Sequence, residues 1–146
     1  MDKHPLRRAR ESQAAAPELA VLLAPNVVFH SPILAKTVRG RELVSQVMAV
    51  AAEIRSGEYI QEMREGCSTF LVWRGLIDGE LIETLELIVD DEAGLILERI
   101  VAMRPLSAAS KFRQIFVEKT RGRLPDEYFG VTPELAREAN LTKELP

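Results

Sequence analysis

The chain has 146 residues, the size of one ordinary domain and too short for two independent hydrophobic cores. Hydrophobic residues make up 47% of it and aromatic residues only 5%, so its apolar content is mainly aliphatic, which excludes a disordered body. Its 19 basic and 22 acidic residues give a net charge of −3, which provides no electrostatic case for nucleic acid or an anionic membrane as a partner.

The cysteine content and the distribution of apolar residues indicate the cellular compartment in which the protein is expected. A single cysteine, Cys67, excludes internal disulfides and a cysteine-based zinc site and is typical of the reducing cytoplasm. No apolar run approaches the roughly 20 residues of a membrane-spanning helix, and residues 1–10 lack the apolar stretch of a signal peptide. We therefore expect a soluble cytoplasmic domain.

The first half of the chain predicts two helices separated by a short strand. Residues 1–10 are basic and are expected to be a flexible start, after which leucines at 19, 22 and 23 predict a helix over about 12–23. The β-branched and aromatic run at 27–29 predicts a strand. Gly40 then precedes a second helix, over about 41–55, whose apolar side chains fall on one face.

After this helix the apolar period changes from 3.6 to 2, which predicts antiparallel strands over 59–64, 68–74, 80–90 and 95–103. Asp78-Gly79 is a strong hairpin signal between the second and third of these strands. The expected class is α+β, with the helices covering one face of a curved antiparallel sheet.

The tail, residues 107–146, is expected to be a helical extension of a body formed by residues 11–106. A helix is predicted over 107–120 and a short final one from about 132 to 140. Four of the eight aromatic residues lie in this tail, so it is expected to dock on the body or on a partner subunit. The basic blocks at 1–10 and 111–124, with charges of +3 and +4, are either solvated helix faces, surfaces that pack against acidic ones, or arms for an acidic partner.

A series of short motifs resembles the nuclear transport factor 2-like superfamily, which includes ketosteroid isomerases, SnoaL-like polyketide cyclases and scytalone dehydratases. The motifs are Phe29-His30-Ser31-Pro32, Gly40 before a helix, Asp78-Gly79, Gly94-Leu95-Ile96 and Arg104-Pro105-Leu106. The resemblance implies a cone-shaped, cystatin-like fold with one deep apolar pocket for a small hydrophobic molecule, commonly in a homodimer.

The resemblance also directs attention to two positions. Where ketosteroid isomerases have a catalytic aspartate, this chain has Ser31, whose hydroxyl is too weak a base to replace a carboxylate. The second acid of the family corresponds to Glu86, eight residues before Gly94. Glu86 is therefore the candidate catalytic residue, as an acid or base for chemistry next to a carbonyl.

Strand alternation places Glu86 on one face with Ile82, Thr84 and Ile88. Among aliphatic neighbours, desolvation is expected to raise the pKa of Glu86 and keep part of it protonated. The alternative is a glutamate that pairs with an arginine such as Arg99 or Arg74. The opposite face, with Leu85, Leu87 and Val89, is expected to form the dimer interface.

The candidate ligand-binding residues are Ser31, Phe29, Tyr59, Thr84 and Trp73, although core packing is the default role for Trp73. His30 is expected to face outward from Ser31 in a structural role, and His4 to lie in the disordered start. No cofactor and no metal ion are expected. Two functions remain open: a cofactor-independent isomerase, cyclase or dehydratase that uses Glu86, and a non-catalytic ligand carrier or dimeric interaction module.

Overall fold

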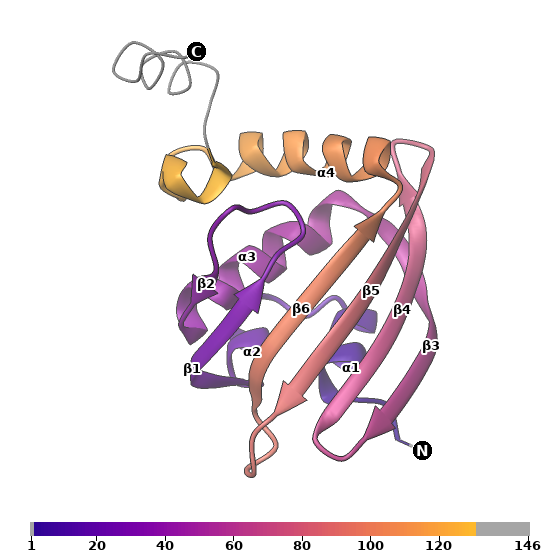
Figure 1. The fold of residues 1–146 in the computed structure, drawn as a ribbon, viewed down its shortest axis with the longest axis vertical. Helices are drawn as coiled ribbons and strands as arrows, with labels where there is room; N and C mark the ends of the chain where they lie inside the picture. The colour runs from indigo at the N-terminus through magenta and orange to yellow at the C-terminus, as the bar shows by residue number, and fades with distance from the viewer. Residues whose placement is uncertain (1, 131–146) are drawn as a thin grey trace, which may run out of the picture.

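The computed structural model describes residues 2–130, which form a curved sheet with helices packed on one side (Figure 1). Over this range the elements are, in chain order, α1 (Pro5–Glu11), α2 (Ala16–Ala20), β1 (Leu23–His30), β2 (Val38–Arg39), α3 (Arg41–Ile54), β3 (Ser56–Glu65), β4 (Ser68–Ile77), β5 (Glu80–Asp90), β6 (Ile96–Arg104), α4 (Leu106–Lys119) and the 3-10 helix η1 (Asp126–Phe129). The α+β class expected from the sequence is confirmed.

The sheet has six strands in the order β2-β1-β6-β5-β4-β3. Strands β3 to β6 form the predicted antiparallel meander, and Asp78 and Gly79 make the β4–β5 turn with φ angles of 48° and 77°. The prediction of a purely antiparallel sheet is wrong at one place, because β1 runs parallel to β6. The long connection through α3 and the meander returns the chain beside β1 in the same direction, as a parallel pair requires.

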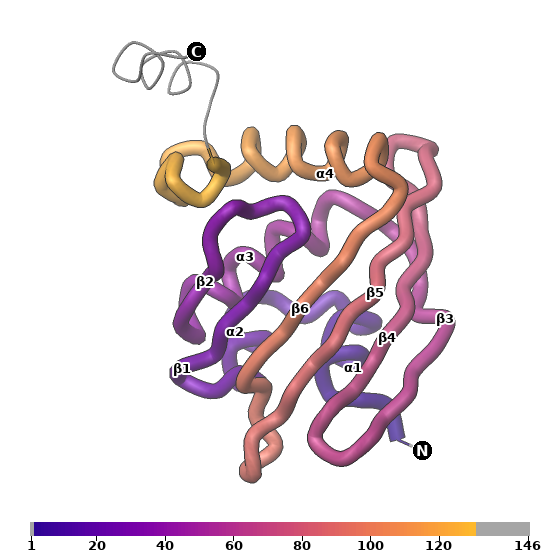
Figure 2. The backbone as a smooth tube through the Cα atoms, in the orientation of Figure 1, coloured from indigo at the N-terminus to yellow at the C-terminus, as the bar shows by residue number. Residues whose placement is uncertain are grey.

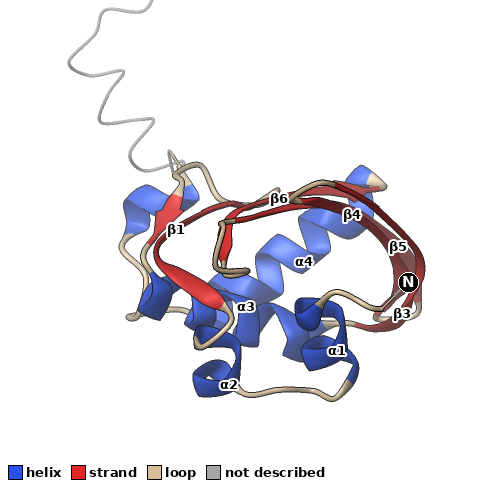
Figure 3. Cartoon of the chain, turned by 90° about the horizontal axis from the view of Figure 1, so that it is seen from below, coloured by secondary structure: helices blue, strands red, loops and turns tan. Residues whose placement is uncertain are grey.

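The sheet curves as a shell around α1 and α3, which lie on its concave side (Figure 3). Along β5 the predicted alternation is confirmed: Ile82, Thr84, Glu86 and Ile88 are buried, whereas Leu81, Leu85 and Leu87 are exposed. The core lies between the concave face and the helices, where Val44, Val47 and Met48 of α3 are buried. The concave surface is therefore where a site can form, and the convex surface faces outward with apolar side chains.

The N-terminal region differs from the prediction of a flexible start followed by one helix over 12–23. Residues 5–11 form α1, which Leu6 anchors in the core with no exposed surface. His4 is also buried: its Nδ1 accepts a hydrogen bond from the Leu6 backbone N–H, and its Nε2 lies 2.9 Å from Asp90 Oδ2. Leu23 already belongs to β1, so the leucine spacing at 19, 22 and 23 spans a short helix and the start of a strand.

The chain beyond β6 packs on the body. In Figure 1, α4 lies across one end of the sheet, and Figure 2 shows the β3–β4 and β5–β6 turns at the opposite end. Phe112 and Phe116 of α4 are buried with their ring centroids 6.3 Å apart, and Phe129 of η1 lies 6.4 Å from Phe116. This part of the tail packs on the body; the final helix predicted over 132–140 lies outside the described residues.

Within residues 2–130, no helix combines the length and the apolar character needed to cross a bilayer.

Candidate functional site

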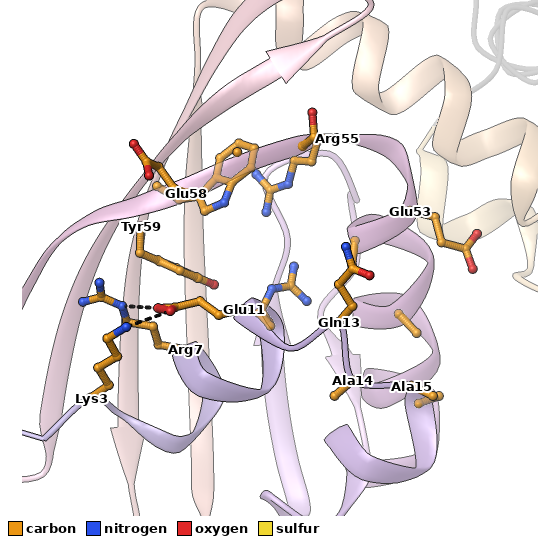
Figure 4. A pocket seen from close by; sticks show the side chains of 17 residues that line it. Lys3, Arg7, Glu11, Gln13, Ala14, Ala15, Glu53, Arg55, Glu58 and Tyr59 are labelled. Atoms are coloured by element: carbon orange, nitrogen blue, oxygen red, sulfur yellow. Dashed lines mark hydrogen bonds and ion pairs between the residues drawn. The ribbon is translucent and has the colours of Figure 1, made fainter.

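A pocket of about 1110 Å³ opens on the concave side, between the N-terminal segment, the end of α3 and the start of β3. Figure 4 shows the side chains that line it. They are Lys3, Arg7, Arg10, Glu11, Gln13, Ala14, Ala15, Ala16, Ala49, Ala52, Glu53, Arg55, Ser56, Gly57, Glu58, Tyr59 and Trp73. The lining combines alanines and aromatic rings with several charged groups, so it is more polar than the apolar pocket expected from the sequence.

The floor of the pocket at Trp73 depends on two glycines. Gly57 of β3 and Gly75 of β4 are direct partners in the antiparallel register. A Cβ atom on Gly57 would lie 2.6 Å from Trp73 Cζ2, and one on Gly75 would also approach the indole closer than van der Waals contact allows. The absence of both side chains therefore lets the indole lie on the sheet at this point.

Arg55 packs on the indole of Trp73. It follows α3 directly, and its guanidinium carbon lies 4.3 Å from the centroid of the Trp73 ring and 5.6 Å from that of Phe112. Burial lowers the pKa of Arg55 to about 9, so the group still carries its charge at neutral pH. Its Nη1 is buried and has no hydrogen-bond partner among the described residues.

The N-terminal segment closes another side of the pocket through ion pairs. Glu11 accepts hydrogen bonds from Lys3 Nζ at 2.8 Å and from Arg7 Nε at 2.7 Å, and Figure 4 shows both. Arg7 also donates to Glu62 Oε1 of β3 at 3.3 Å and lies over the ring of Tyr59. These contacts attach α1 to β3, so the wall that α1 forms is part of the folded body.

Glu86, the candidate catalytic acid, is buried in an ion pair. Arg99 Nε donates a hydrogen bond of 2.7 Å to Glu86 Oε1, and both side chains are nearly inaccessible to water. The expectation of a raised pKa is wrong. Burial alone would raise the pKa of Glu86, but the positive charge and hydrogen bond of Arg99, helped by Arg10 and Arg55, lower it below its ordinary value.

The other predicted residues separate into two groups. Tyr59 and Trp73 line the pocket, and burial raises the pKa of the Tyr59 hydroxyl. Phe29 instead packs under the guanidinium of Arg99, with 4.8 Å between the ring centroid and the guanidinium carbon. Ser31 Oγ accepts a hydrogen bond from the backbone N–H of Ile33 in the loop after β1. None of Ser31, Phe29, Thr84 and Glu86 is among the residues that line the pocket.

Thr84 is nevertheless close to this region in the sheet, because it is the direct partner of Trp73 in the β4–β5 register. Its Oγ1 is buried without a hydrogen-bond partner among residues 2–130. His30 lies outside the core, as expected, with Nε2 3.2 Å from Glu98 Oε2.

Sequence reasoning missed Arg55 and the whole N-terminal wall. A sequence signal for the position of the Trp73 indole was present in the spacings Gly57-x-Tyr59 and Trp73-x-Gly75. The antiparallel register pairs Gly57 with Gly75 and Tyr59 with Trp73. The prediction of a flexible start over residues 1–10 left no role for Arg7 and Arg10 in a site.

No protein-family model and no curated protein sequence matches the chain. Solved structures do. A protein of cystatin-like fold from Silicibacter pomeroyi DSS-3 is 27% identical and superposes with a TM-score of 0.75, over 82% of this chain and 88% of that one. A steroid delta-isomerase from Pseudomonas aeruginosa is 20% identical with a TM-score of 0.74, over 78% and 85%. The chain has the nuclear transport factor 2-like fold.

This assignment agrees with a protein from Mesorhizobium loti described as nuclear transport factor 2-like and of unknown function. It is 17% identical with a TM-score of 0.61, over 68% of this chain and 85% of that one. The fold that the short motifs imply is thereby confirmed. Because one fold can carry unrelated functions, the fold does not select the activity, and the side chains of the site must do so.

Proposed function

We propose that this protein binds a small organic molecule in the pocket between α1, the end of α3 and the start of β3. The observation that carries the proposal is the pocket itself, which at about 1110 Å³ is large enough for a small organic molecule and offers both apolar and charged groups. Trp73 and Tyr59 offer aromatic surface, and the alanines of α3 and of the α1–α2 segment offer aliphatic surface.

The state of Glu86 favours binding over acid–base catalysis. A general acid or base works best with a pKa near the operating pH, whereas Arg99 lowers the pKa of Glu86 below 4.5, which makes it a poor proton donor and a weak base at neutral pH. The hydroxyl of Ser31 accepts a loop hydrogen bond and offers no carboxylate in place of the family's aspartate. We therefore favour a ligand carrier or sensor over an isomerase, cyclase or dehydratase.

The test uses Trp73, the single tryptophan of the chain, as a fluorescent reporter of the pocket. Aliphatic and aromatic small molecules of different chemical classes are titrated against the protein, and we expect saturable changes in Trp73 fluorescence for one class. Ala52 is exposed on α3 and lines the pocket, so Ala52→Phe should fill the space and weaken binding by about 10-fold or more.

The matched control is Ala93→Phe, an exposed position in the turn between β5 and β6, far along the chain from the pocket lining. It should leave binding unchanged. Equal affinities of the Ala52→Phe variant and the wild-type protein would place binding elsewhere and overturn the proposal.

A second proposal concerns the convex face, which we infer to be the contact surface of a homodimer. Outward-facing apolar side chains of β4, β5 and β6 are direct cross-strand neighbours, so they form a continuous patch. Such patches mark interaction sites on folded proteins, and a patch on a two-fold axis can pack against its own copy. The two rows are Phe70–Leu87–Ile100 and Val72–Leu85–Ala102.

Sedimentation at micromolar concentration checks this proposal. The wild-type protein should sediment as a dimer and Leu85→Lys as a folded monomer, because the charge at this exposed position would be buried without a partner in the dimer. Leu81→Lys, also exposed on β5 but outside both rows, is the control and should remain dimeric. A monomeric wild-type protein would overturn the dimer.

A further inference from the structure

The pocket region contains more positive charge than its carboxylates neutralise. Arg10, Arg99, Glu86 and Tyr59 all lie near enough to Arg55 to influence its pKa. Only Glu86 among them supplies a negative charge at neutral pH, and it accepts the hydrogen bond from Arg99. Arg10 donates to the backbone carbonyl of Met48 at 3.3 Å, which brings no compensating charge. Arg55 thus lacks an ionic partner in this cluster.

The three carboxylates on the pocket lining do not supply that partner either. Glu11 is occupied by Lys3 and Arg7, and Glu53 lies 3.7 Å from Lys119 of α4. Glu58 is exposed, and Figure 4 shows the carboxylates of Glu53 and Glu58 pointing away from the space between Arg55 and Tyr59. Arg55 is partly buried, with Nη1 fully buried, and residues 2–130 supply it no counter-charge; such a charge is costly, which makes this space favourable for an anion.

Arg55 is also held in an orientation suited to binding an anion. Its guanidinium carbon lies over the Trp73 ring at 4.3 Å and over the Phe112 ring at 5.6 Å, so two aromatic rings hold the group in place. Contact with aromatic rings does not use up the N–H donors of a guanidinium, whose planar fork matches the geometry of a carboxylate. Arg55 lines the pocket, and its buried Nη1 has no hydrogen-bond partner among residues 2–130, so the group has unused hydrogen-bonding capacity.

We propose that the ligand is an organic acid whose anionic head pairs with Arg55 and whose apolar body lies along the alanine-lined side of the pocket. This inference rests on the proposed function of the pocket and specifies its ligand class. The head occupies the space between Arg55 and the Tyr59 hydroxyl, toward which both side chains point in Figure 4. The body lies against Ala14, Ala15, Ala16, Ala49 and Ala52.

The experiment compares acids with their neutral amides at pH 7: decanoate with decanamide by Trp73 fluorescence, and naphthalene-2-carboxylate with naphthalene-2-carboxamide by calorimetry. Each acid should bind about 10- to 100-fold more tightly than its amide, the difference expected of one charge-assisted interaction in a buried site. In Arg55→Gln this preference should disappear while the amides bind as before. Arg121→Gln, an exposed arginine beyond α4, should keep the preference.

Thermal unfolding of the free variants separates an anion-binding Arg55 from a structural one. Arg55→Met keeps an apolar side chain against Trp73 and removes the unpaired charge, so it should unfold at the same or a higher temperature while losing the acid preference. A lowered unfolding temperature with equal loss of acid and amide binding would mean that Arg55 acts only in packing, and would overturn the inference.

The two proposals fail in different ways. If acids and amides bind the wild-type protein equally, the pocket binds ligands but Arg55 does not select anions. If none of the four probes binds at millimolar concentration, both the ligand class and the binding function are overturned for molecules of this kind.

Discussion

Glu86→Gln is expected to lower the free energy of unfolding by about 3–5 kcal/mol, the usual cost of removing one partner from a buried ion pair. The substitution keeps the shape of the side chain but leaves the charge of Arg99 buried without its carboxylate partner. Urea unfolding followed by circular dichroism measures the change.

Two further variants test whether the loss of stability comes from the buried ion pair between Glu86 and Arg99. Glu83→Gln, on the same strand, removes a carboxylate that pairs with Arg74 and Arg104 at the surface, and its effect should be much smaller. The double variant Glu86→Leu/Arg99→Met removes both buried charges and should be closer in stability to the wild-type protein than Glu86→Gln is. A loss below about 1 kcal/mol in Glu86→Gln would contradict the importance of the pair.

The same pair makes stability depend on pH in a definite direction. The pKa of Glu86 is lowered in the folded protein, so the folded state binds fewer protons at this site than the unfolded state does. The stabilisation is fully present above the ordinary glutamate pKa of 4.5 and is lost as the pH falls from there through the lower folded value. Glu86→Gln should therefore lose this part of the acid sensitivity, which urea titrations at a series of pH values can measure.

Gly75→Ala is expected to destabilise the protein by about 3 kcal/mol, near the upper end of the range for overpacked positions. The new methyl group would collide with the backbone oxygen of Ser56, the Cα of Gly57 and the Trp73 ring, and backbone atoms in a strand pair cannot easily move apart. The indole would have to leave its position, and Arg55 would lose the ring on which it stacks. Both unfolding in urea and the Trp73 emission maximum should therefore change.

Gly94→Ala serves as the control for this substitution. Gly94 has a φ of 83° with no atom near an added Cβ, so alanine there costs stability through the backbone alone. It should leave the Trp73 emission unchanged. An unchanged emission maximum in Gly75→Ala would show that the glycine pair does not position the indole.

Local sequence signals were sufficient to predict most of the elements. The four strands of the meander follow from alternation and from Asp78-Gly79, and α3 follows from its apolar face and the preceding Gly40. The parallel pairing of β1 with β6 could not be predicted in this way, because it depends on how the sheet curves rather than on any short segment. The docking of α1 could not be predicted either, because a basic segment with a single leucine lacks the apolar face that indicates a core helix.

The candidate site could also be predicted only in part, because its side chains come together through the register and not through local sequence. Alternation placed Glu86 on the buried face and left Arg99 as one possible partner, but only the register brings Arg99, opposite Ile88, within hydrogen-bond distance of Glu86. Without that distance, the sign of the pKa shift could not be derived from burial alone. Arg55 has no sequence signal of its own, because its importance comes from Trp73 and Phe112, which lie 18 and 57 residues later in the chain.

The position of α1 has a practical consequence for anyone who prepares this protein. Composition alone would suggest trimming the basic start of the chain or attaching a purification tag directly to it. Because Leu6 is buried and Arg7, Arg10 and Glu11 line the pocket, a shortened chain that starts at residue 12 lacks one side of its own binding site. Ligand screens on such a chain would sample a different cavity, so tags are better separated from His4 by a spacer that leaves its contact with Asp90 intact.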